Sequence, residues 1–232
     1  MNELKQFDFN QDVFTTPTRN SRGIKSVLPD SRYIKPPICK ETPEIYLKYE
    51  LAEKLASDLI PEKGMRAFCL INGTFIAGDF IEAFIVKHNI HVKRLTISTL
   101  SLSQNNVDSL SNLLEGGYVD ELNLVVSDYF FAHERRGLVQ YMYDILDNGE
   151  KFQLAAAGTH CKLTMIETHC GLKITMHGSA NLRSSSNIEH ICIEEGEALY
   201  DFNYDVQEKI IDKYKTIRKS VRYNDIWQAV QK

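Results

Sequence analysis

Four polar side chains that could bind and attack a phosphate lie within a short stretch of the sequence. His160 and Lys162 are two residues apart at the start of a predicted strand, and Ser179 and Asn181 follow the strand after it. Lysine supplies a point positive charge, and serine and asparagine supply neutral hydrogen-bond donors. Histidine can act as a nucleophile or proton carrier near neutral pH. The combination therefore predicts a phosphate site.

A β-hairpin is the element that must position these side chains. Residues 162–167 and 172–177 predict two strands, joined by a turn at 168–171. If the turn centres between His169 and Cys170, His160 faces Ser179 and Lys162 faces His177. Side chains alternate along a strand, so His160 and Lys162 share one face. His177 is then either a second proton carrier or a polar residue that lines the site.

The rest of the sequence predicts an α/β fold with a mixed, mostly parallel sheet flanked by helices. Three strands are each followed by a helix, and this alternation predicts parallel pairing. Four later strands with no long helix between them add an antiparallel section. The predicted strands are 66–71, 92–99, 121–127, 152–157, 162–167, 172–177 and 189–193, and the helices are 78–88, 105–114 and 131–147. A final helix places Val206, Ile210, Tyr214, Ile217 and Val221 on one face.

Proline content predicts where the domain begins. Residues 1–43 hold five of the six prolines and no sustained period, which indicates an extended arm. The arm is a phosphate-contacting segment, a solvated tail or a docking site for an unidentified protein partner. A helix with a leucine every fourth residue follows, ended by Pro61 and Gly64. We expect an α/β domain over 44–222 and a tail over 223–232.

Residues 158–195 resemble the His-x-Lys-x4-Asp motif region of the phospholipase D superfamily, with its trailing Gly-Ser-x-Asn and Asn-x-Glu. They look most like short, single-motif members carried by bacteriophages and mobile elements. The resemblance implies a phospholipase D-like fold in which His160 attacks phosphorus and forms a phosphohistidine. It implies that Lys162 and Asn181 hold the non-bridging oxygens with help from Ser179. Glu189 would accept a hydrogen bond from the other imidazole nitrogen.

This chain differs from the pattern of the superfamily in two features. Members of the superfamily combine two motifs at one site, whereas this chain has one, which implies a symmetric homodimer with the hairpins at the axis. The family's aspartate falls at Glu167, one methylene longer, where the family's acid is largely architectural. We expect Glu167 to support the fold rather than take part in the chemistry.

Composition and charge limit the other function classes. The 232 residues are 43% hydrophobic and carry a net charge of −4, so the chain is neither disordered nor a polycation. Neither a signal peptide nor an apolar run of membrane-spanning length is predicted. The five scattered cysteines indicate a reducing cytoplasm. No P-loop, dinucleotide, zincin or esterase motif occurs, so no cofactor is expected.

A zinc site is the alternative chemistry, because Thr-His-Cys occurs twice, at 159–161 and 168–170. On alternating strand positions His160 and Cys161 point to opposite faces, which disfavours a shared metal. The long predicted helix begins with His133, Arg135 and Arg136, which either border a substrate groove or form a solvated face.

These observations predict a metal-independent phosphodiesterase, specifically a nuclease that cleaves DNA or RNA through a phosphohistidine at a site shared across a homodimer. The first alternative is a non-catalytic nucleic-acid-binding or regulatory protein that retains the phosphate pocket. The second is a phospholipid-processing enzyme, which the absence of a strongly basic or apolar amphipathic surface helix disfavours.

Overall fold

The computed structural model describes residues 33–34, 52–71, 76–147, 151–183 and 187–216. Contacts divide the chain into two units, 1–30 and 31–232, and every described residue belongs to the second. The arm predicted over 1–43 therefore lies outside the described residues except for 33–34, and so does the predicted tail.

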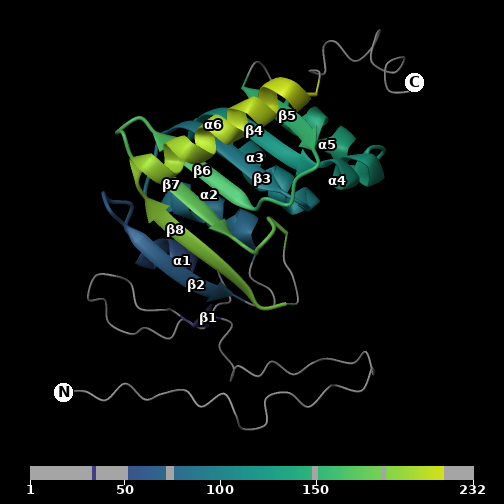
Figure 1. Cartoon of the computed structure of the whole chain (residues 1–232). Helices are drawn as coiled ribbons and strands as arrows, with labels where there is room; N and C mark the ends of the chain where they lie inside the picture. Colours follow the sequence, from purple (N-terminus) through teal and green to yellow (C-terminus); the bar gives the residue numbers. More distant parts are fainter. Residues whose placement is uncertain (1–32, 35–51, 72–75, 148–150, 184–186, 217–232) are drawn as a thin grey trace, which may run out of the picture. The chain divides into compact units, whose positions relative to one another are not determined.

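A mixed sheet is the central layer of the second unit (Figure 1). Its described strands lie in the order β1-β2-β8-β7-β6-β3-β4-β5. Their bounds are β1 Tyr33–Ile34, β2 Arg66–Ile71, β3 Val92–Thr99, β4 Val119–Ser127, β5 Phe152–Ala157, β6 Leu163–Thr168, β7 Lys173–Gly178 and β8 Glu189–Glu195. The predicted fold class, a mixed sheet flanked by helices, is confirmed.

Antiparallel pairing is more extensive in the sheet than the sequence predicted. Only β3–β4 and β4–β5 pair in parallel among the described strands, and the other five pairings are antiparallel. The strands β6, β7 and β8 lie between β2 and β3, so β2 does not join the parallel section. Alternation of strand and helix along the chain predicted the element types but could not show which strands become neighbours.

Helices cover both faces of the sheet (Figure 1). They are α1 Ala52–Asp58, α2 Ala77–Lys87, α3 Gln104–Glu115, α4 Asp128–Glu134, α5 Leu138–Leu146 and α6 Glu197–Tyr214. The main core lies on the face of α1, α2, α3 and α5, where Phe84 and Leu95 are fully buried. On the opposite face, α6 packs Tyr200 against Met165, and Ile211 against Val125. Within the described ranges, none of the helices combines the length and apolarity that crossing a bilayer requires.

Two helix predictions need correction. The predicted helix 131–147 is two helices, because the backbone at Gly137 leaves the helical region with φ −126° and ψ −98°. The first of them, α4, begins earlier, where the Ser127 hydroxyl accepts a hydrogen bond from Phe130 N at 3.1 Å.

The sequence placed Val206, Ile210 and Tyr214 on one face of the last helix, together with Ile217 and Val221, which lie outside the described residues. That face is not the one α6 buries. The side chains that α6 buries are Tyr200, Gln207 and Ile211. Val206 and Tyr214 are 42% and 44% exposed. The part of the sheet beneath α6 is partly polar, with buried Thr96 and Ser98, so the more apolar side of the helix is turned away from it.

Candidate active site

The sequence-predicted site residues gather at one edge of the sheet. Parallel strands β3, β4 and β5 end at this edge, and the antiparallel pairing of Ser98 with Leu163 places the start of β6 there as well. His160 and Lys162 lie between β5 and β6, and Ser179 and Asn181 follow β7. Glu189 is the first residue of β8, next to the end of β7. We call this the site edge.

The hairpin register differs by one residue from the predicted one. Leu163 pairs with His177, and Glu167 pairs with Lys173, so the turn centres on Cys170. The Thr168 hydroxyl, which donates to Leu172 O at 3.1 Å and accepts from Leu172 N at 2.8 Å, closes the turn around this centre. The prediction that Lys162 faces His177 is therefore wrong.

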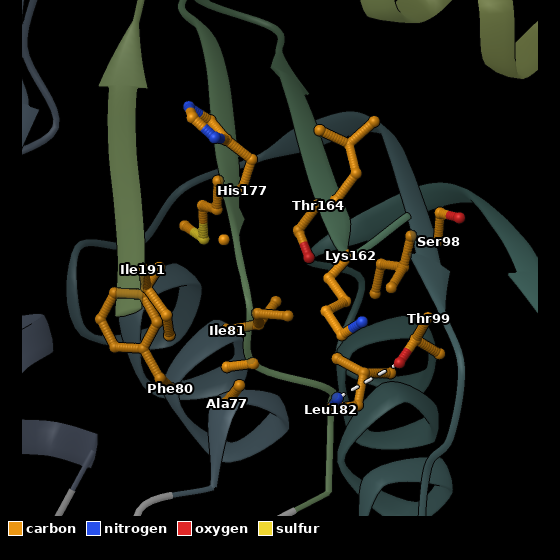
Figure 2. Close-up of a pocket in the computed structure, with 15 residues that line it drawn as sticks. Ala77, Phe80, Ile81, Ser98, Thr99, Lys162, Thr164, His177, Leu182 and Ile191 are labelled. Atoms are coloured by element: carbon orange, nitrogen blue, oxygen red, sulfur yellow. Dashed lines mark hydrogen bonds between the residues drawn. The ribbon is translucent and has the colours of Figure 1, made fainter. Parts of the chain in front are cut away.

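His177 lies on the α6 side of the sheet, because directly paired residues of an antiparallel ladder share a face and its partner Leu163 packs near Tyr200. Figure 2 shows the His177 imidazole directed away from the Lys162 ammonium. The prediction of a second proton carrier opposite Lys162 rested on the incorrect register. His177 does line the pocket, which is the other alternative that the sequence left open.

Lys162 is one of the residues that line a small pocket whose walls are mostly apolar (Figure 2). The walls come from α2, β3, β6, β7 and the loop after β7, and include Phe80, Ile81, Ile97, Met176 and Leu182. Lys162 Nζ donates to the carbonyl oxygen of His160 at 3.3 Å. No ion pair joins Lys162 to a carboxylate of the described residues, so its charge is available to an incoming anion.

Hydrogen bonds fix the segment after β7 that carries Ser179 and Asn181. Asn181 Oδ1 accepts from Leu100 N at 3.2 Å, which orients the amide and leaves its NH₂ group as a donor. Ser179 N donates to His190 O at 3.0 Å, and Ser179 Oγ accepts from His190 N at 3.0 Å. The Ser179 hydroxyl proton is still available for a ligand oxygen.

Contacts beyond the motif hold the same segment against the core. Leu182 N donates to Thr99 Oγ1 at 3.3 Å, the bond drawn in Figure 2. Leu182 O accepts from Gly78 N at 3.0 Å, so the segment is tied to both β3 and α2. The donors at Ser179 and Asn181 are therefore preorganised, as stabilisation of a developing negative charge requires.

The predicted bond between His160 and Glu189 is not formed in the structure. His160 is exposed and Glu189 is half-buried, and neither side chain has a hydrogen-bond partner among the described residues. Both residues lie at the site edge, and the pairing of their side chains stays a prediction.

Glu167 lies at the far end of β6 from the site edge. It lies five positions along the chain from Lys162, a span of about 17 Å in a strand. Its carboxylate pairs with Lys93 at 2.8 Å and with Arg94 at 3.5 Å. These contacts brace β6 against β3.

The two Thr-His-Cys segments flank β6 at its opposite ends, so residues 160–161 and 169–170 are separated by the length of the strand. His169 Nε2 instead lies 2.7 Å from Asp120 Oδ2. The described residues contain no cluster of three or more His, Cys, Asp or Glu side chains suited to a metal ion.

Sequence reasoning missed two residues that the structure places at the site edge, Asp128 and Tyr129. Ser127, at the end of β4, pairs with Ala157, at the end of β5. A Cβ atom placed at Gly158 would lie 3.8 Å from Asp128 Oδ2, so α4 begins beside the segment that carries His160. The available signal was a serine at the end of a buried strand, which can cap a following helix, but the predicted helix began three residues after the observed one.

Comparison with known proteins gives likenesses of structure only. Neither a family model nor a curated protein matches the sequence. Nuc of Salmonella typhimurium, described as a phospholipase D family member, is 13% identical with a TM-score of 0.48, over 66% of this chain and 99% of its own. NucT of Helicobacter pylori is 10% identical with a TM-score of 0.48, over 67% of this chain and 100% of its own. Phosphatidylserine synthase of Haemophilus influenzae is 13% identical with a TM-score of 0.45, over 72% of this chain and 45% of its own.

Proposed function

We propose that the chain is a metal-independent phosphodiesterase that cleaves nucleic acid at the site edge. The observation that carries this proposal is the arrangement around Lys162. Its ammonium has no ion pair with a described carboxylate, and it precedes β6 beside the hydrogen-bonded segment that presents Ser179 and Asn181. One cation and two preorganised neutral donors suit the non-bridging oxygens of a phosphodiester.

His160 supplies the nucleophile in this proposal. A neutral imidazole nitrogen attacks phosphorus, a P–N bond forms, and the bond from phosphorus to the leaving oxygen breaks. The leaving oxygen takes a proton from an acid on the opposite side. Water then attacks the phosphohistidine and gives a proton back to the deprotonated acid, the P–N bond breaks, and a phosphomonoester and free His160 result. Lys162, Ser179 and Asn181 stabilise the equatorial oxygens in both steps, and Glu189 orients the imidazole once its side chain reaches it.

The acid on the opposite side is best supplied by His160 of a second copy, and α6 offers a surface for such a partner. Phe202, Val206 and Tyr214 are 68%, 42% and 44% exposed, and half-buried Ile210 completes a spacing of four residues. Residues four apart share a helix face, so these side chains form one apolar stripe, here called the α6 stripe. Contiguous exposed apolar surface marks sites of protein association.

The oligomeric state can be tested with two variants of α6. Val206→Glu places a charge in the α6 stripe and should shift the protein from dimer to monomer in light scattering, with loss of cleavage. Asp212→Lys changes the charge of another exposed α6 position outside the stripe and should leave the dimer intact. A strict monomer of the wild-type protein that still cleaves would overturn the shared site.

One observation favours a second candidate function, a nucleic-acid-binding protein that does not cleave. His160 and Glu189 are not hydrogen-bonded, so nothing in the described residues fixes the imidazole tautomer that attack requires. A protein of this kind would use Lys162, Ser179 and Asn181 to bind the backbone phosphate alone.

Cleavage assays separate these functions. Wild-type protein, His160→Ala and His91→Ala should be incubated with labelled single-stranded and double-stranded DNA and RNA in EDTA. His91 is an exposed histidine before β3, at the opposite edge of the sheet, and serves as the matched control. We expect cleavage and a trapped phosphohistidine in wild type and His91→Ala only. Cleavage that persists in His160→Ala refutes the mechanism, whereas binding without cleavage supports the second candidate.

A further inference from the structure

An exposed pair of aromatic rings in tilted contact lies on α4. The Tyr129 and His133 ring centroids are 3.8 Å apart with an interplanar angle of 33°. His133 Nδ1 lies 2.8 Å from Tyr129 O, which holds the imidazole against the helix backbone. Tyr129 is 70% exposed. One face of the tyrosine is thus supported by a second ring while most of the side chain is open to solvent.

The sheet places the start of α4, which carries Tyr129, beside the segment that carries the proposed nucleophile. Ser127 pairs with Ala157, and Tyr129 and Gly158 follow these paired residues within two positions. Asp128 Oδ2 would lie 3.8 Å from a Cβ atom at Gly158, which fixes the separation of the two segments. His160 comes two residues after Gly158, at most about 7 Å along the chain.

A flat ring on a segment next to a phosphate site suits a nucleotide chain, in which each phosphate is followed by a base. Bases stack on aromatic side chains irrespective of sequence, because every base has a π-face. In a duplex these faces are covered by neighbouring base pairs, so they cannot reach the ring without unstacking. The ring pair can therefore discriminate strands by whether a base is free.

We propose that Tyr129, supported by His133, is a base-stacking subsite that makes the site edge select single-stranded over double-stranded nucleic acid. This inference rests on the proposed function, since it needs a phosphate bound near Lys162. The chemistry recognised is an unpaired base, whether the sugar is deoxyribose or ribose.

Binding of labelled oligonucleotides tests the subsite without cleavage. His160→Ala protein should be titrated with fluorescent oligo-dT, oligo-U and a mixed-sequence duplex in EDTA at fixed salt, alone and combined with Tyr129→Ala, Tyr129→Trp or His91→Ala. We expect Tyr129→Ala to weaken both single-stranded oligomers about tenfold or more, and duplex binding by less than about twofold. Tyr129→Trp should restore tight binding, and His91→Ala should have no effect.

The possible failures can be told apart. Equal affinity of Tyr129→Ala and its parent for oligo-dT and oligo-U overturns the subsite alone, and so does an equal loss for single strand and duplex. Failure of Tyr129→Trp to restore binding shows that the tyrosine acts through the fold, which also overturns it. Absence of any nucleic-acid binding by the parent protein refutes the proposed function and the subsite together.

Discussion

A methyl group added at Gly178 should disrupt the contacts that hold the segment carrying Ser179 and Asn181. A Cβ atom at this position would lie 2.1 Å from His190 O, 3.0 Å from His190 C and 3.1 Å from Ile191 Cα. Ordinary van der Waals contact begins at 3.4 Å, so the strands must separate by about 1.3 Å. All three atoms belong to the backbone of β8, which β2 holds from its other side, and none can move aside as a flexible side chain could.

The expected loss in the free energy of unfolding has two contributions. Overpacking of this kind costs about 1–3 kcal/mol. The same movement stretches the two hydrogen bonds that join Ser179 to His190, each worth about 1 kcal/mol. Gly178→Ala should therefore lower the free energy of unfolding by about 3 kcal/mol. For a chain of this length, that corresponds to a fall of roughly 6–12 °C in the melting temperature.

Thermal melting of Gly178→Ala and Gly158→Ala, followed by circular dichroism, checks this expectation. Gly158 lies at the same site edge, but its nearest neighbour would be 3.8 Å from the added Cβ atom. Gly158→Ala should melt within about 2 °C of wild type. If Gly178→Ala also melts within about 2 °C of wild type, the close approach of β7 and β8 does not hold the segment after β7. The preorganisation of Ser179 and Asn181 then loses its basis.

Two further changes test the opposite end of the sheet. Glu167→Asp should shorten the reach of the carboxylate to Lys93 and Arg94 and so lower the free energy of unfolding by about 1 kcal/mol, measured from the denaturation midpoint. Cleavage should not change, and a higher kcat would instead show that this acid takes part in the chemistry. Burial raises the pKa of Glu208, with Arg94 opposing the shift, so the ionised carboxylate destabilises the fold as the pH rises through the folded pKa. Glu208→Gln should accordingly unfold at higher urea than wild type at neutral pH and show no gain at about pH 3, below the unfolded pKa; an equal gain at both pH values would contradict this.

Local patterns were sufficient to predict most elements of the fold. The strands 66–71, 92–99 and 152–157 were predicted with the observed bounds, because apolar and β-branched residues recur along each of them. The hairpin register failed by one residue, because it depends on side-chain hydrogen bonds of Thr168 within the turn. A one-residue change of register moves a side chain to the other face, and this accounts for the error at His177.

Helix faces could not be predicted from periodicity alone. Val206, Ile210 and Tyr214 recur at a helical spacing, yet α6 buries Gln207. Which side of an amphipathic helix faces the sheet depends on the surface it meets, and Thr96 makes that surface partly polar. The pattern correctly indicated an apolar face, but that face is exposed, and under our proposal a second copy covers it.

The separation between the proposed nucleophile and the base-stacking ring is set by sheet register rather than by loop length. The pairing of Ser127 with Ala157 fixes where α4 and the His160 segment leave the sheet. A register can change only in whole residues, and a one-residue slip between β4 and β5 would bury polar faces and expose apolar ones. Only the short segments from Ser127 to Tyr129 and from Ala157 to His160 can therefore change the distance between the ring and the nucleophile. A distance held in this way allows a stacked base to position the neighbouring phosphate.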